Sequence, residues 1–99
     1  GFDLNDYLNS MFRMYNGDRK QIELVCDNDI MDSIIDKFGK DVTVLANDMK
    51  SFRVLVNTSV GSVFYSWIFG FCGKVMIKSP EKVKEEYAQM VRDAAQALQ

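Results

Sequence analysis

The chain has no histidine and only two cysteines and one proline among its 99 residues. Without histidine, it lacks the side chain that most often acts as a general base near neutral pH. Cys26 and Cys72 do not form a CxxC pair, and two cysteines do not make a disulfide framework. These absences argue against an enzyme, a zinc site and a disulfide-rich secreted domain. We expect no cofactor, no metal and no catalytic residue.

The sequence also has no excess of positive charge and no long apolar run. Its formal net charge of -2 is not typical of a surface that neutralises phosphates, so we expect no specific DNA binding by this chain itself. No apolar run approaches the roughly 20 residues that span a bilayer, and no signal-peptide pattern is present. We therefore expect no membrane association and a cytoplasmic location, where both thiols stay reduced even if Cys26 and Cys72 approach one another.

Apolar periodicity predicts an N-terminal segment, four strands and three further helices. The strands are predicted at residues 20–26, 41–46, 51–58 and 74–78. Asp3, Asp27 or Asn28, and Ser79 are the expected helix caps, and Gly39 is the expected end of the first core helix. The βαββαβ order predicts an α+β ferredoxin-like sandwich with strand order 4-1-3-2, at residues 20–99. Residues 1–19 form the N-terminal linker or helical segment, and the last helix is an addition to the fold.

One helix is predicted to be the centre of the core. Its apolar residues recur at helical spacing: Val60, Val63, Phe64, Trp67, Ile68 and Phe71. The predicted structural core includes Trp67, Phe64, Phe71 and, from the last helix, Tyr87. Trp67 is expected to pack against the sheet and not to hold a ligand.

The second face of the predicted sheet is the candidate site. Alternation places Val25, Leu45, Leu55 and Met76 on that face, on adjacent strands. An open face of an antiparallel sheet is normally polar, and an exposed apolar stripe marks a partner surface. The alternative is that the N-terminal segment or the last helix folds over this stripe.

The remaining residues give little support to an enzymatic function. Cys72 lies beside glycines, but no base accompanies it, and a small structural thiol is the better interpretation. Asp27 and Asp29 share one predicted turn, and helix capping explains them better than metal binding does.

Three segments together resemble a known family. They are the stretch from Trp67 to Pro80 (WIFGFCGKVMIKSP), the opening Phe2-Asp3-Leu4-Asn5-Asp6-Tyr7 and the closing Glu86-Tyr87 helix. The chain resembles the C-terminal extension, or WCX-type domain, of bacterial WYL-domain transcriptional regulators, from about Phe2 to Leu98. Neither the Trp-Tyr-Leu signature nor a winged helix is in this sequence.

The resemblance implies a non-catalytic regulatory and oligomerisation domain. It implies a homodimer in the full-length protein, contact with an upstream WYL sensor domain or a second subunit, and DNA contact only through an upstream winged helix. The rival interpretation is a small-molecule sensor resembling an ACT domain. A glycine-rich loop after the first strand would favour that sensor, whereas residues 26–30 (CDNDI) contain no glycine.

Overall fold

The computed structural model describes the backbone of residues 3–99 and the side chains of residues 3–11 and 17–99. Its elements, in chain order, are α1 (Leu4–Asn16), β1 (Asp18–Asp27), the short 3-10 helix η1 (Asn28–Ile30), α2 (Met31–Phe38), β2 (Thr43–Ala46), β3 (Ser51–Val60), α3 (Ser62–Phe69), β4 (Val75–Ser79) and α4 (Glu81–Ala97). The four strands form one antiparallel sheet in the order β2-β3-β1-β4. The predicted α+β class is therefore confirmed.

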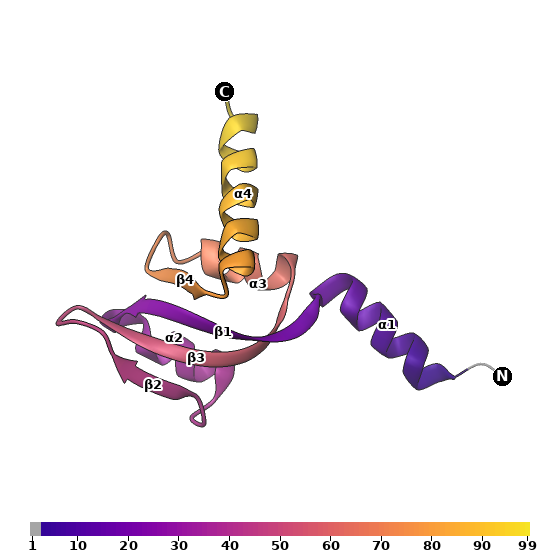
Figure 1. Cartoon of the computed structure of the whole chain (residues 1–99), viewed down its shortest axis with the longest axis horizontal. Coiled ribbons are helices and arrows are strands. Elements are labelled where there is room, and N and C mark those ends of the chain that lie inside the picture. Colours follow the sequence, from indigo (N-terminus) through magenta and orange to yellow (C-terminus); the bar gives the residue numbers. More distant parts are fainter. Residues whose placement is uncertain (1–2) are drawn as a thin grey trace.

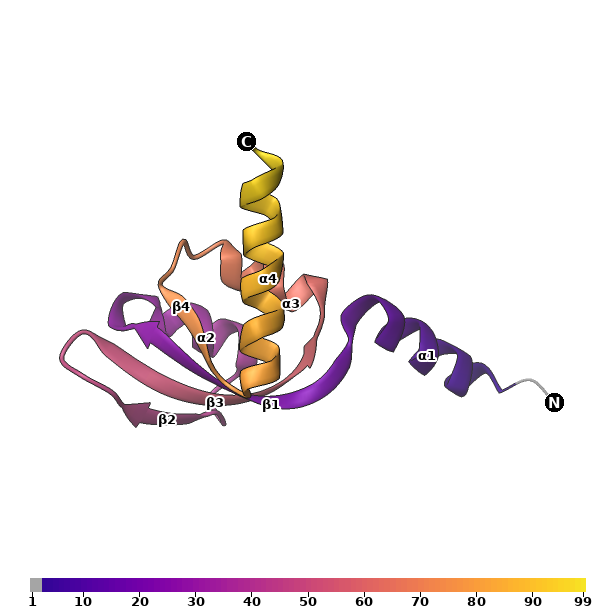
Figure 2. The ribbon, with the colours of Figure 1, turned by 45° about the horizontal axis from the view of Figure 1, so that its top comes forward.

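Helices cover one face of this sheet (Figure 2). The buried cluster joins alternate residues of the strands to residues of η1, α2, α3 and the start of α4. From the strands it contains Ile22, Leu24, Cys26, Phe52, Val54, Val56, Val75 and Ile77. This is the parity that the alternating sequence predicted, because successive side chains of a strand point to opposite faces.

The predicted helix caps have mixed outcomes. Asp3 does cap α1, since its Oδ1 accepts the backbone N–H of Asn5 at 2.9 Å. Asp27 precedes η1 but makes no side-chain cap bond, whereas the Asn28 side chain donates to the Met49 carbonyl at 3.1 Å. The Ser79 cap is wrong: Ser79 is the last residue of β4, paired with Glu23 in the ladder. Pairing within the sheet therefore holds Ser79 in a strand, although the sequence pattern predicted it as a helix cap.

The helix at the centre of the core is also shifted from its predicted position. Val60 belongs to β3, and α3 begins at Ser62. Val63 is consequently 56% exposed, while Tyr65, absent from the predicted stripe, is buried. The stripe from Val60 to Val63 was therefore wrong, because Val60 pairs with Asp18 at the end of the ladder and cannot start the helix.

The predicted core aromatics lie on the helical side of the sheet. Phe64 is buried, and Trp67, Phe71 and Tyr87 pack half-buried against the cluster. The Trp67 ring meets the rings of Phe38 at 5.4 Å and Phe71 at 4.9 Å between centroids, both edge to face. Such aromatic pairs stabilise a core beyond the area they bury.

We predict that Trp67→Ala lowers the free energy of unfolding by about 3 kcal/mol, near the lower end for truncated core aromatics because the ring is only half-buried. Val63→Ala, four residues earlier on the same helix, is the matched control and should change it by less than about 0.5 kcal/mol. Urea unfolding measures both. A larger loss at Val63 than at Trp67 would contradict this view of α3.

Gly17 fixes how α1 leaves the body of the protein. Its φ is +83°, and a Cβ built on it would lie 1.6 Å from the carbonyl oxygen of Val60. Only glycine allows this approach and this backbone conformation together. From this point α1 runs away from the sheet (Figure 1). The N-terminal segment is therefore held away from the second face of the sheet, contrary to the alternative in which it covers that face.

Replacing Gly17 by alanine should open the end of the central ladder. The clash involves the Val60 backbone and can be relieved only by moving one strand away from the other. Gly39→Ala is the control, since Gly39 has a similar φ of +86° with nothing within 4 Å of a built Cβ. Both variants should lose about 1–3 kcal/mol through backbone strain. Only Gly17→Ala should also speed amide hydrogen exchange at residues 18–20, and equal exchange there would refute the role assigned to Gly17.

Candidate partner-binding face of the sheet

The candidate site is the face of the sheet opposite the helices, called here the outer face. Its predicted residues are Val25, Leu45, Leu55 and Met76, and the strand pairing brings all four onto this face. Val25 pairs with Met76 on one side and with Arg53 on the other, and Arg53 in turn pairs with Leu45. Leu55 lies between Glu23 and Thr43. The four apolar side chains therefore do not form one straight row.

Two of them, Val25 and Leu55, form an apolar diagonal across the two central strands. Met76 lies directly beside Val25, and Leu45 lies diagonal to Leu55 on the other edge strand. Diagonal neighbours on antiparallel strands lie about 7–8 Å apart, within reach of long side chains. Val25, Leu45 and Leu55 are half-buried in the chain, and Met76, on the edge strand, is 52% exposed. Arg53 thus interrupts the predicted stripe between Val25 and Leu45, and the exposed apolar surface is concentrated at the β4 edge.

Sequence reasoning missed a charged diagonal that crosses the apolar one. The Glu23 carboxylate lies 3.4 Å from the Arg53 guanidinium and 3.6 Å from the Lys78 ammonium. The Glu23 side chain is only 17% exposed. Strand alternation places Glu23 and Arg53 on this face, but only the register shows that they are diagonal neighbours. Because Arg53 and Lys78 remain partly in water, each pair stabilises the fold by at most about 1 kcal/mol.

The combination of the two diagonals defines what the face can bind. Arg53 and Lys78 both already contact Glu23, so neither cation is free to bind a phosphate. Apolar side chains beside charges that satisfy one another are compatible with a protein–protein interface. Within the described residues, no group of three or more histidine, cysteine or carboxylate side chains could hold a metal ion.

The cysteines and nearby carboxylates lie at the end of the sheet where β1 ends and β4 begins. Cys26 and Cys72 are both free thiols. Burial, and secondarily the negative charge of Asp27, raises the pKa of Cys26 to about 12. Cys72 is exposed in the turn before β4, with φ +54°. Asp29 forms an ion pair with Lys74 at 2.7 Å, which explains this carboxylate without a metal.

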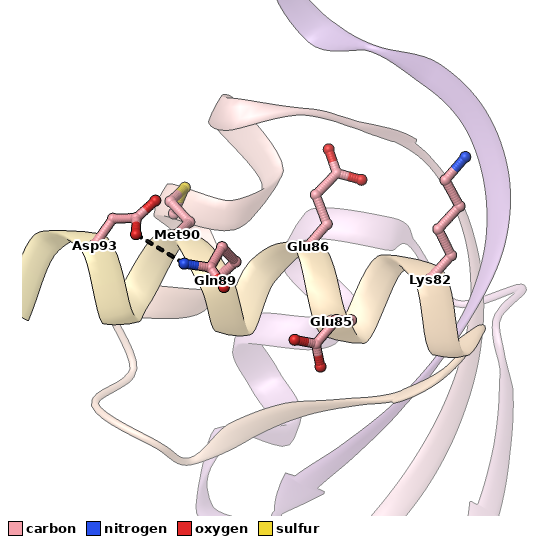
Figure 3. A pocket seen from close by; sticks show the side chains of 6 residues that line it. All are labelled: Lys82, Glu85, Glu86, Gln89, Met90 and Asp93. Carbon is pink, nitrogen blue, oxygen red and sulfur yellow. Dashed lines mark hydrogen bonds between the residues drawn. The ribbon is translucent and has the colours of Figure 1, made fainter.

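A hollow also runs along the outside of α4 (Figure 3). It is lined by Lys82, Glu85, Glu86, Gln89, Met90 and Asp93. All of these residues come from one helix, and Gln89 donates to Asp93 at 2.8 Å. Because no second element supplies a converging group, the hollow offers no catalytic arrangement.

No protein-family model matches the chain, and neither does any curated protein sequence. Among residues 3–99, none of the helices combines the length and the apolar character that crossing a membrane requires.

The two thiols should differ sharply in reactivity. At pH 8, iodoacetamide should modify Cys72 in the native protein and leave Cys26 untouched until the chain is unfolded, because the thiolate is the reactive form. Mass spectrometry of the intact protein measures this, and Cys72→Ser should abolish native labelling. Equal modification of both thiols would contradict the buried position of Cys26.

The raised pKa of Cys26 also implies a direction for stability at alkaline pH. The unfolded chain releases this proton near pH 9, whereas the folded protein keeps it to about pH 12. The contribution is therefore fully present below pH 9 and is lost as the pH rises from about 9 to 12. Cys26→Ala, compared with the parent across this window by urea unfolding, should show a shallower decline.

Proposed function

We propose that this chain is a non-catalytic regulatory and oligomerisation domain of a bacterial transcriptional regulator of the WYL-domain type. Its outer face contacts a second subunit or the upstream sensor domain, and DNA is bound only by a winged helix elsewhere in the full-length protein. The observation that carries the proposal is the outer face itself, where Val25, Leu45, Leu55 and Met76 lie on the side of the sheet opposite the buried cluster. Free thiols at Cys26 and Cys72 support a reducing, cytoplasmic location.

The fold that we propose is the ferredoxin-like sandwich that the resemblance implies. Counted from β4, the sheet has the order β4-β1-β3-β2, and every neighbouring pair is antiparallel. Helices α2 and α3 follow the first and third strands and both contribute to the buried cluster on one face. This order and this layering support the ferredoxin-like assignment, with α1 and α4 as additions at the two ends.

The ACT-like alternative receives no support from the loop after the first strand. That loop contains η1, and its groups are already used within the chain. The backbone N–H of Asn28 donates to the Lys50 carbonyl at 2.9 Å, and Asp29 pairs with Lys74. A small effector would have to displace these contacts, so a protein partner on the outer face remains the better proposal.

Replacing Leu55 by lysine tests the role of the outer face. Leu55 lies directly opposite Glu23, so the new ammonium gains a carboxylate neighbour and the fold should be retained. A partner that packs on this face would instead have to bury the charge. We expect self-association to weaken at least tenfold, measured by sedimentation equilibrium over a range of protein concentrations.

Met49→Lys is the matched control, because Met49 is exposed in the turn between β2 and β3. It should assemble as the parent does, and circular dichroism melting should show that both variants are folded. If Leu55→Lys is folded and assembles like Met49→Lys, the outer face is not a self-association surface.

A further inference from the structure

The second half of α4 extends beyond the sheet and the other helices (Figures 1 and 2). The first half is anchored by buried Val83 and by Tyr87, whose ring lies 5.6 Å from that of Tyr65. From residue 92 onward every residue is exposed. Residues 94–99 (AAQALQ) carry no charged side chain, which is unusual for a helix end that faces only water.

A small apolar groove lies where this projecting half leaves α3. It has a volume of about 160 Å³ and is lined by Ser66, Phe69, Met90, Val91 and Ala94. Phe69, at its rim, is 57% exposed. An apolar cavity of about 150 Å³ holds a molecule of the size of benzene, so this groove has room for one aliphatic side chain.

The side chain that fits this groove occurs on the same helix. Leu98 is 90% exposed and lies one turn beyond Ala94, on the face of α4 that also carries Met90 and Ala94. Leu98 does not line the groove of its own chain, to which α4 contributes Met90, Val91 and Ala94. A second copy of this chain carries both the groove and the leucine on the same face.

The charged residues of this part of α4 do not interrupt the apolar face. Arg92 pairs with Glu85 at 2.7 Å and donates a second hydrogen bond to the side-chain oxygen of Gln89, also at 2.7 Å. These residues occupy the opposite side of the helix by their spacing from Ala94. The residues that line the groove include no charged side chain, which favours an apolar side chain as its occupant.

We propose that α4 pairs with α4 of a second copy of this chain, antiparallel about a two-fold axis near Ala94. An antiparallel arrangement reverses residue order, so Leu98 of each copy lies opposite Met90 of the other and enters its groove. The same patch then serves both copies, as a two-fold interface requires. Alanine at the axis allows the two helices to approach closely.

The expected contact is small. With Ala94 at its centre and Phe69 and Leu98 of both copies beside it, it buries on the order of 1,000 Å² in total, at the low end for specific interfaces. The dimer is therefore weak and concentration-dependent. This contact leaves the outer face of the sheet free for another domain, so it goes beyond the proposed function and does not depend on it.

Site-specific cross-linking tests the pairing in the whole chain. In a Cys72→Ser background, Ala94→Cys places a thiol at the proposed axis, and Gln96→Cys places one on the opposite side of α4. Under mild oxidation, Ala94→Cys should form covalent dimers at least tenfold faster than Gln96→Cys, measured on non-reducing gels. Cys26 is buried and does not interfere. Equal rates for the two variants would overturn the proposal.

Sedimentation equilibrium provides the second readout. Leu98→Asp should raise the dissociation constant of the dimer at least tenfold, whereas Leu4→Asp, at an exposed position of α1, should not. If Leu98→Asp self-associates as the parent does, the α4 pairing is wrong. If Ala94→Cys forms covalent dimers and Leu55→Lys leaves self-association unchanged, the copies associate through α4 and not through the outer face. If Ala94→Cys does not cross-link and Leu55→Lys weakens self-association, α4 pairing is wrong and the proposed function stands.

Discussion

The ladder between β1 and β3 is the constraint on which the rest of the structure depends. It pairs ten residues of each strand, from Asp18 with Val60 to Asp27 with Ser51. A shift of one residue would turn every side chain of a strand to the other face. Here it would expose Ile22 and Leu24, which are fully buried. The buried faces of the two strands therefore hold the register, and both edge strands are placed by pairing with them.

That register also determines the character of the outer face. With Glu23 opposite Leu55 and Val25 opposite Arg53, apolar and charged pairs necessarily lie on crossing diagonals. The long stem of an arginine can cover neighbouring apolar surface while its guanidinium stays in water. We infer that this arrangement keeps a partly apolar face compatible with a free chain and still available to a partner. Charges that already satisfy one another need not lose all their contacts when water is excluded.

The additions at the two ends of the chain are held outward for different reasons. For α1 the reason is local, because Gly17 lies against the Val60 backbone in a conformation that L side chains rarely adopt. For α4 the reason is length, because a 17-residue helix extends about 25 Å, more than the four-stranded sheet below it needs. In the described structure both projecting segments expose apolar side chains, Leu4 and Leu8 on α1 and Leu98 at the end of α4. Contacts between molecules are therefore best sought at these ends and on the outer face.

Periodicity alone determined the α+β class, the existence of each core element and the two faces of the sheet. These follow from the spacing of apolar residues, which depends only on backbone geometry. It also placed Asp3 correctly, since a helix cap is a local interaction. Element ends that depend on a distant partner were not predictable. Ser79 belongs to β4 because it pairs with Glu23, and Val60 belongs to β3 because it pairs with Asp18. The expected cap and the expected start of α3 were therefore wrong.

The candidate site divides in the same way. Sequence placed Val25, Leu45, Leu55 and Met76 on one face, because alternation within each strand is sufficient for that. It could not show that Glu23 lies within reach of both Arg53 and Lys78, since those contacts depend on how three strands are aligned with one another. The groove between α3 and α4 likewise could not be predicted, because it depends on how the two helices pack together and the periodicity of one helix does not report this. Local spacing thus determined which surface each residue occupies, and only tertiary structure decided which residues meet there.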